Sequence, residues 1–295
     1  MTVKAYAKIN LGLDVLRRRS DGYHDVKMIM QSVNLFDVLD TRLELCGEKD
    51  CLSLGEFGRI EIVCSNGDIP CDETNLVYKA ALKFLQLAKV KTDIFVKIEK
   101  NIPVGAGLAG GSADAAAVIC ALNTMLDAGF SKKELADAAK DIGADVPFCI
   151  FNNTYLAQGI GEILTPVDSR LKLNILLVKP PFSVSTPYVY KNLVLDGNTY
   201  HPDIDKIKNA LETGNVLKVC ENLGNTLESV TVKMHPEIDK IKKKLVSLGA
   251  LSSLMSGSGP SVFGIFDDYE KTENAYNYMK QKYKQTYLTS TLNNV

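Results

Sequence analysis

The fifteen-residue segment PVGAGLAGGSADAAA (103–117) sets the tightest limits on how this chain can fold. Before it, apolar and polar residues alternate over 92–99, which predicts a strand. After it, small residues continue and predict a helix over about 111–128. Glycine allows positive φ and close backbone approach, and the free amides at a helix start favour an anion. The segment therefore predicts a strand, a tight loop and a helix whose first turn suits a di- or triphosphate.

Several kinds of phosphate loop could account for this segment. The dinucleotide fingerprint G-x-G-x-x-G fits Gly105, Gly107 and Gly110, and Asp127 lies about 20 residues further on. That acidic residue should end a strand, whereas Asp127 falls in or just after the predicted helix. The strand over 92–99 is also too polar for a parallel sheet buried on both faces. A dinucleotide-binding fold is therefore disfavoured.

The P-loop and the protein-kinase glycine loop are the other phosphate-binding alternatives. Gly105 to Gly110 has P-loop spacing, but Gly111 stands where that loop has its lysine. A protein kinase would need H-R-D and D-F-G elements downstream, and neither occurs in the sequence. A turn that merely packs a helix tightly on a sheet also stays open. If the segment serves phosphoryl transfer, its positive charge must come from elsewhere in the chain.

The rest of the chain mixes helical and strand patterns, so the predicted fold class is α+β. Strands are expected at 3–16, 28–45, 60–64, 155–161, 173–178, 251–256, 261–266 and 286–291. One helix is expected at 75–89, with Thr74 as its cap, and a second begins at a Ser131–Glu134 capping box and ends near residue 143. Further helices are expected at 204–211, 216–223, 236–248 and 269–283. A division near residue 160 gives an N-terminal domain over 1–160 and a C-terminal domain over 161–295.

Three polar segments could contribute to a site. Lys8 and Asn10 fall on one face of the first strand because strand side chains repeat every two residues, and this pair could face solvent or a ligand. Asp145 follows the helix that ends near 143, where it could stabilise a turn or orient a substrate hydroxyl and accept its proton. Residues 254–261 form a second glycine- and serine-rich loop, which suits an anion nest or an ordinary hairpin.

Taken in chain order, these segments resemble the GHMP kinases, a superfamily named for galactokinase and the homoserine, mevalonate and phosphomevalonate kinases. The likeness rests on AKINL (7–11), the loop 103–117, GADVP (143–147) and the loop 254–261. RSDGYH (19–24) and the G-G-S at 110–112 are similar to the subgroup that phosphorylates the 2-hydroxyl of 4-diphosphocytidyl-2-C-methyl-D-erythritol, in the non-mevalonate route to isoprenoid precursors. A homoserine- or mevalonate-type kinase is the alternative.

The resemblance implies two α+β lobes, an N-terminal lobe like domain 2 of ribosomal protein S5 and a ferredoxin-like C-terminal lobe, with the active site in the cleft between them. It implies ATP and Mg²⁺ as co-reactants. Lys8 and Asp145 match the catalytic lysine and aspartate. The implied nucleotide-binding residues are Asn75, Pro103, Val104, Gly105, Ala106, Gly107, Leu108, Ala109, Gly110, Gly111, Ser112 and Ala113. The implied substrate-binding residues are Asn10, Tyr23, His24, Lys100, Thr186 and Tyr190. No metal ligand is assigned.

Composition argues against several other classes of protein. A net charge of −1 and a pI near 6.3 give no electrostatic case for nucleic-acid binding. No stretch approaches the 18 apolar residues of a membrane span, and residues 1–10 lack the apolar core of a signal peptide. The seven cysteines form no C-x-x-C pair, which argues against a zinc site or a disulfide framework. We therefore expect a cytoplasmic monomer or weak homodimer without nucleic-acid or membrane partners.

Overall fold

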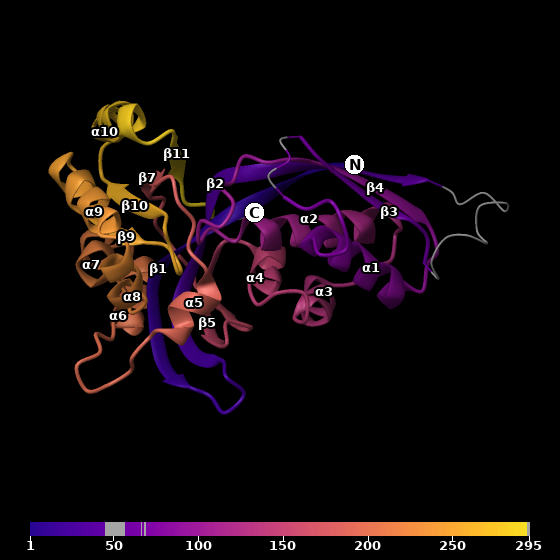
Figure 1. Cartoon of the computed structure of the whole chain (residues 1–295), viewed down its shortest axis with the longest axis horizontal. Coiled ribbons are helices and arrows are strands. Elements are labelled where there is room, and N and C mark those ends of the chain that lie inside the picture. Colours follow the sequence, from indigo (N-terminus) through magenta and orange to yellow (C-terminus); the bar gives the residue numbers. More distant parts are fainter. Residues whose placement is uncertain (45–56, 66, 68, 294–295) are drawn as a thin grey trace. The chain divides into compact units, whose positions relative to one another are not determined.

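The computed structural model describes residues 1–44, 57–65, 67 and 69–293, and these residues form both helices and strands (Figure 1). The chain divides into two compact units that interleave in sequence. Unit 1 comprises Met1–Ala7, Phe36–Val104 and Ala109–Phe151, and unit 2 comprises Lys8–Leu35, Gly105–Leu108 and Asn152–Val295. Strands β1 (Thr2–Arg18) and β2 (His24–Glu44) therefore contribute residues to both units. The division into 1–160 and 161–295 stays a prediction.

Unit 1 packs helices on a sheet. Its elements beyond β1 and β2 are β3 (Ile60–Cys64), α1 (Leu76–Ala88), β4 (Asp93–Glu99), α2 (Gly110–Met125), α3 (Lys132–Ala139) and α4 (Val146–Phe151). Strand β4 pairs in parallel with β3 and antiparallel with the C-terminal half of β2. Helix α2 packs on α1 and on α4. Only alternate residues of β4 are buried, namely Ile94, Val96 and Ile98, so this strand is unlike the doubly buried strand that precedes a dinucleotide-binding loop.

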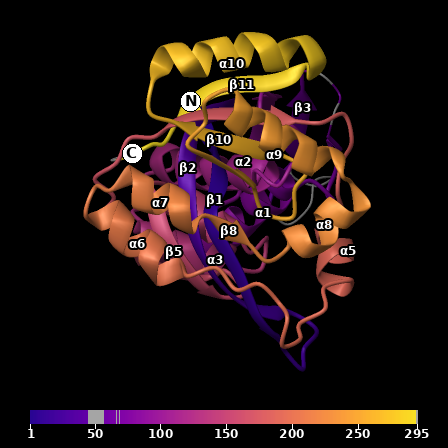
Figure 2. The ribbon, with the colours of Figure 1, turned by 90° about the vertical axis from the view of Figure 1, so that its left-hand side faces the viewer.

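Unit 2 contains a second sheet. Its elements beyond β1 and β2 are β5 (Thr154–Gly159), β6 (Ile163–Pro166), β7 (Asn174–Lys179), α5 (Thr186–Lys191), α6 (Ile204–Glu212), α7 (Val216–Asn222), β8 (Gly224–Asn225), α8 (Glu228–Met234), α9 (Glu237–Ser247), β9 (Ser252–Met255), β10 (Val262–Phe266), α10 (Tyr269–Lys282) and β11 (Gln285–Ser290). Among the described residues, four antiparallel strands follow the order β11-β7-β10-β9, with α9 and α10 packed on them. Helix α10 runs alongside β11 (Figure 2).

The rest of unit 2 is organised around the hairpin between β1 and β2. The turn is closed by a hydrogen bond of 2.8 Å from Arg19 N to Tyr23 O. Strand β5 pairs antiparallel with the N-terminal half of β2, and β8 pairs in parallel with β1 at Gly12 and Leu13. The residues between Arg18 and His24 therefore form the tip of a long hairpin.

Most predicted elements are confirmed within a few residues, including the Ser131–Glu134 capping box. The predicted cap at Thr74 is wrong. Asn75 caps α1 by accepting a hydrogen bond from Val77 N, while the Thr74 hydroxyl donates to Asp72. Helices α4, α5 and α8 and strands β6 and β8 were not predicted. The second strand was predicted to end at Leu45, which lies outside the described residues. Cys46 and Cys51 lie outside them as well.

Within the described part of the chain, no helix is both long enough and apolar enough to span a bilayer.

Candidate active site

The first glycine loop (103–109) leads into α2, as the sequence predicts. Gly105 and Gly107 have φ of 61° and 75°, which glycine adopts without strain. Ala109 at the N-cap of α2 also has a positive φ, 56°. A non-glycine residue in this conformation is strained and persists only where its surroundings hold it. The path of this loop is therefore imposed by the fold.

Helix α2 begins with an open first turn. In the described residues no side chain caps the helix, and its first turn has no acidic residue. A Cβ added at Gly111 would meet only Leu76 Cδ1, at 3.6 Å, so the backbone is accessible there. Exposed amides at the positive end of a helix dipole are a favourable site for phosphate oxygens.

The first glycine loop packs in unit 2 against a second glycine loop (256–261). Ser261 N donates to Ala106 O at 3.3 Å, and Ser256 Oγ donates to Gly107 O at 3.0 Å. A Cβ added at Gly107 would lie only 2.3 Å from Ser256 O. The two loops thus touch through their backbones, and this approach requires glycine at position 107.

Asn225, in β8, holds the second glycine loop in place, and sequence analysis missed it. Its Nδ2 donates to Met255 O at 2.9 Å and to Gly257 O at 2.8 Å, while its Oδ1 accepts from Leu227 N. The side chain is almost fully buried. No local signal could have revealed this role, because the two carbonyls lie 30 and 32 residues further along the chain.

Lys8 and Asn10 face the same side of β1, as strand periodicity predicts, and both are buried. Lys8 Nζ donates to Asn10 Oδ1 at 2.8 Å, and Asn10 Nδ2 contacts Met28 Sδ at 3.3 Å. The backbone of Lys8 bonds to Leu108 O at 3.1 Å. A Cβ added at Gly257 would lie 3.4 Å from Lys8 Nζ. Within unit 2, the backbone of Lys8 therefore contacts the first glycine loop, and the side chains of Lys8 and Asn10 lie beside the second.

Asp145 lies in unit 1, half-buried, in the turn that directly precedes α4. That turn adjoins the start of α2, since a Cβ added at Gly143 would lie 3.8 Å from Ser112 Oγ. The carbonyl of Asp145 accepts the amide of Cys149 at 3.1 Å and so begins α4. The turn that carries the predicted catalytic residue Asp145 and the predicted phosphate-binding turn are thus neighbours in the same unit.

Asn75, also in unit 1, uses both ends of its side-chain amide within the protein. Its Oδ1 caps α1, and its Nδ2 donates to Pro70 O at 2.6 Å. The residue is buried. Its contact with a nucleotide stays a prediction.

His24 and Tyr190 meet in unit 2, although 166 residues separate them in the sequence. Their ring centroids are 5.2 Å apart with a 38° tilt. His24 is buried at the start of β2, and burial, assisted by the Arg18 guanidinium, lowers the pKa of its imidazole below the usual value. Tyr23 beside it is 61% exposed. The structure thus brings together two residues for which the family resemblance implies substrate binding.

Thr186 begins α5, and its hydroxyl shares a hydrogen bond of 2.7 Å with Ser258 Oγ of the second glycine loop. It is joined to this loop within unit 2, so Thr186 lies among the loops that sequence analysis assigned to the site. Its contact with a substrate stays a prediction.

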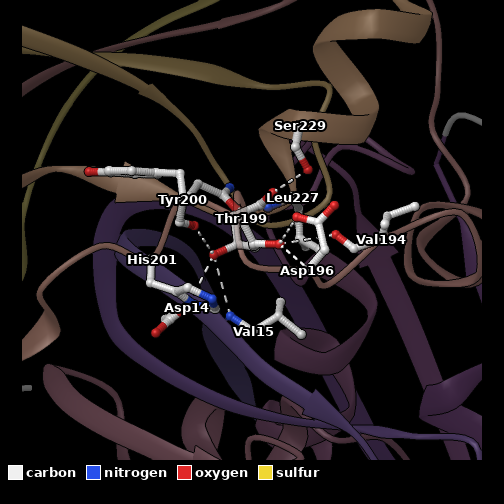
Figure 3. A network of polar contacts seen from close by, with 11 residues as sticks. Asp14, Val15, Val194, Asp196, Thr199, Tyr200, His201, Leu227 and Ser229 are labelled. Carbon is white, nitrogen blue, oxygen red and sulfur yellow. Dashed lines mark hydrogen bonds and ion pairs between the residues drawn. The ribbon is translucent and has the colours of Figure 1, made fainter.

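A partly buried polar network contacts the segment that follows α5 (Figure 3). Asp14 Oδ1 lies 2.6 Å from His201 Nδ1 and accepts the Thr226 hydroxyl at 3.1 Å. That hydroxyl in turn accepts from Val15 N at 3.4 Å. The network links Tyr200 and His201 to β1 through Thr226 and Asp14.

Lys100 is buried in unit 1, where its ammonium pairs with Asp37 and Asp114. Burial lowers its pKa, but the two carboxylates outweigh this effect and raise the pKa above the usual lysine value. A contact of Lys100 with substrate stays a prediction.

Comparison with known proteins identifies the family. The model for the GHMP kinases N terminal domain matches residues 75–153, and that for the GHMP kinases C terminal domain matches residues 199–285. The chain belongs to the GHMP kinases. It is therefore an enzyme of the kinase class, and the predicted α+β fold of this family is confirmed.

Full-length relatives of this GHMP kinase carry a more specific name. The chain is 47% identical over 292 residues to a Clostridium kluyveri protein named 4-diphosphocytidyl-2-C-methyl-D-erythritol kinase, and 44% identical to a protein of the same name from Clostridium botulinum. Both matches cover 99% of this chain and 100% of the relative.

Solved structures agree with this family assignment. A crystal structure of 4-(cytidine 5'-diphospho)-2C-methyl-D-erythritol kinase matches all of both chains with a TM-score of 0.82 and 29% identity. Homoserine kinase from Cytophaga hutchinsonii matches with a TM-score of 0.76 and 20% identity, covering 99% of this chain and 94% of that one. At that identity the second match shows the fold alone.

Proposed function

We propose that this chain phosphorylates the 2-hydroxyl of 4-diphosphocytidyl-2-C-methyl-D-erythritol with ATP, in the non-mevalonate route to isoprenoid precursors. The observation that carries the proposal is the full-length identity of 43–47% to relatives that bear this kinase name. Because ATP and cytidine diphosphate-linked metabolites occur in the cytoplasm, we propose that the reaction takes place there. A monomer or weak homodimer without nucleic-acid or membrane partners stays our expectation.

The first glycine loop and the start of α2 are the proposed binding site for the ATP phosphates. The uncapped first turn of α2 and the absence of acidic side chains there favour an anion. Mg²⁺ would neutralise charge on the triphosphate. In the described residues no group of three His, Cys, Asp or Glu side chains could hold a metal. That fits a Mg²⁺ ion that takes most of its ligands from phosphate oxygens and water.

Lys8 and Asp145 are the proposed catalytic residues. Phosphoryl transfer needs in-line positioning and neutralisation of charge more than covalent help. The Lys8 ammonium, fixed by Asn10, would stabilise charge on the transferring phosphoryl group. A carboxylate is a weak base toward an alcohol. We therefore propose that Asp145 orients the substrate hydroxyl and takes its proton late, when bond formation has made the hydroxyl acidic.

Tyr23, His24 and Tyr190 are the proposed cytidine-binding residues. An exposed tyrosine ring can stack on a pyrimidine, and a neutral imidazole can both donate and accept hydrogen bonds at the base edge. The contact between His24 and Tyr190 supports a common role for these two rings. Asn10 and Thr186 remain candidates for the polar part of the substrate.

A coupled ADP-release assay with a panel of acceptors tests this proposal. We expect turnover with 4-diphosphocytidyl-2-C-methyl-D-erythritol and, at equal concentration, rates at least about 10²-fold lower with homoserine and mevalonate, because stacking and base-edge hydrogen bonds reject acceptors without cytosine. Comparable or faster turnover of homoserine or mevalonate would contradict the proposal and identify the chain as a homoserine or mevalonate kinase.

A further inference from the structure

Three charged side chains form a buried cluster in unit 1. Their relative exposures are 0% for Asp37, 3% for Lys100 and 2% for Asp114. Lys100 Nζ donates to Asp114 Oδ2 at 2.8 Å and also to Asp37 Oδ2. A buried ion pair is weak evidence for stability, because desolvation of the charges offsets their attraction. The cluster therefore calls for an explanation other than a gain in stability.

The cluster is attached to the backbone on both sides of the first glycine loop. Before the loop, Asp37 Oδ1 accepts the amides of Asn101 at 2.6 Å and Ile102 at 2.8 Å. After the loop, Asp114 belongs to the second turn of α2. Lys100 joins the two carboxylates, so the entry and the exit of the loop are fixed through one ammonium group.

The first residue of α2 rests directly on this cluster. A Cβ added at Gly110 would lie 3.3 Å from Lys100 Nζ and 3.0 Å from Ile102 Cγ2. The ammonium is therefore packed beneath the turn whose outer face is open at Gly111. A displacement of Lys100 would shift the amides of that turn.

The carboxylates of Asp37 and Asp114 differ in how many of their oxygens have a hydrogen-bond partner. Asp37 uses both carboxylate oxygens, whereas Asp114 Oδ1 is buried with no hydrogen-bond partner in the described residues. Burial, only partly offset by Lys100, raises the pKa of Asp114 to about 7. An unsatisfied buried oxygen costs stability. The buried carboxylate of Asp114 thus lowers the stability of the fold, which points to a role in positioning the first turn of α2.

We propose that Asp37, Lys100 and Asp114 are positioning residues that hold the first turn of α2 in register with the loop entry, so that its amides are arranged for the phosphates of ATP. The proposal rests on the proposed use of this turn as the phosphate site. It replaces the expectation that Lys100 touches the cytidyl substrate. The cluster would act on nucleotide affinity and not on the acceptor.

A comparison of the Asp114→Ala and Asp114→Asn variants tests the proposal. Asparagine keeps an oxygen that can accept from Lys100, whereas alanine removes the link to α2. We expect Asp114→Ala to weaken ADP binding, measured by titration calorimetry, by about ten- to a hundredfold, since small misplacements of binding groups have effects of this size. Asp114→Asn should restore ADP binding to within about threefold of wild type, and the KM for the cytidyl substrate should hardly change in either variant.

Two results would overturn the proposal. One is wild-type ADP affinity in a folded Asp114→Ala protein. The other is a rise in the KM for the cytidyl substrate without a change in ADP affinity, which would restore Lys100 as a substrate contact. If alanine prevents folding, Asp114→Ser gives the same comparison with a smaller polar group. ADP binding does not depend on the acceptor, so failure of the proposed function would appear separately, as absent turnover by the wild type.

Discussion

Lys8 and Asn10 are two residues apart on β1, and a hydrogen bond of 2.8 Å joins Lys8 Nζ to Asn10 Oδ1 in a buried setting. The amide oxygen fixes the ammonium at a defined point on the strand. The backbone of Lys8 bonds to Leu108 of the first glycine loop, and the position of a Cβ on Gly257 lies 3.4 Å from its Nζ. Lys8 therefore contacts the first glycine loop through its backbone and places its ammonium beside the second.

Lys8→Met should lower kcat by about 10²- to 10³-fold, because a positioned charge that stabilises the transition state is lost. The methionine stem keeps the packing of the side chain, so the melting temperature should change little. Lys4→Met is the matched control. Lys4 lies on the same strand, exposed, with Nζ 4.2 Å from the centre of the Phe36 ring. Steady-state rates that fall equally in both variants would remove Lys8 from its catalytic role.

Asp145→Asn should reduce kcat by about 10²-fold or more, the usual scale for losing a proton acceptor. ADP affinity should be nearly unchanged, because the amide amino group occupies the same space. Asp141→Asn serves as control, since its carboxylate is 86% exposed and pairs with Lys83 at 3.5 Å. Near-normal turnover of Asp145→Asn under saturating substrates would contradict the assignment.

Gly107→Ala should lower both stability and activity, because the new Cβ would lie 2.3 Å from Ser256 O and φ is 75°. Gly129→Ala is the control that measures the loss of folding stability caused by a positive φ alone. Gly129 has a φ of 72°, but a Cβ added there meets nothing within 4 Å. We expect a loss of roughly 1 kcal/mol for Gly129→Ala from strain alone and a clearly larger loss for Gly107→Ala. Equal losses in urea unfolding would show that the two glycine loops are not in close backbone contact.

The binding of the cytidyl substrate should depend on the protonation of His24. Burial and the Arg18 guanidinium lower the pKa of the His24 imidazole below its usual value, which favours the neutral ring. Protonation removes the hydrogen-bond acceptor of the ring, so the KM for this substrate should rise as the pH falls through the pKa of His24. Since the unfolded chain binds this proton first, folding stability should also fall in the same direction.

Arg18→Gln tests the cause of this pKa shift. Without the guanidinium the pKa of His24 should rise, and the increase in KM should begin at a higher pH than in wild type. NMR titration of the His24 ring, assigned with a His24→Gln variant, measures the pKa directly. A shift of the profile to lower pH would be inconsistent with the proposed electrostatics.

Local rules explain why much of the site could be predicted. The period of two along a strand was enough to put Lys8 and Asn10 on one face. Glycine positions with small residues after them located the start of α2 to within one residue. The Ser131–Glu134 capping box is also a local pattern, and it forms as predicted.

What the sequence could not show depends on distant partners or on very short elements. The resemblance implied a substrate contact for Lys100, and no local pattern could show its partner Asp37, which lies 63 residues earlier in the chain. Asn225 has no local sign of its role at the second glycine loop. Helix α4 has six residues, nearly all apolar, so it carries no helical periodicity, and α5 is equally short. Asn75 displaced the expected cap at Thr74 because either residue type can cap a helix.

The most direct test of the proposed activity is ³¹P NMR of the product formed from ATP and 4-diphosphocytidyl-2-C-methyl-D-erythritol. Carbon 2 of this acceptor bears a methyl group and no hydrogen, so a phosphate on its hydroxyl has no three-bond coupling to a carbinol proton. We predict one new phosphomonoester singlet that grows in step with ADP. A proton-coupled multiplet, or ADP release without any new phosphomonoester signal, would contradict transfer to the 2-hydroxyl.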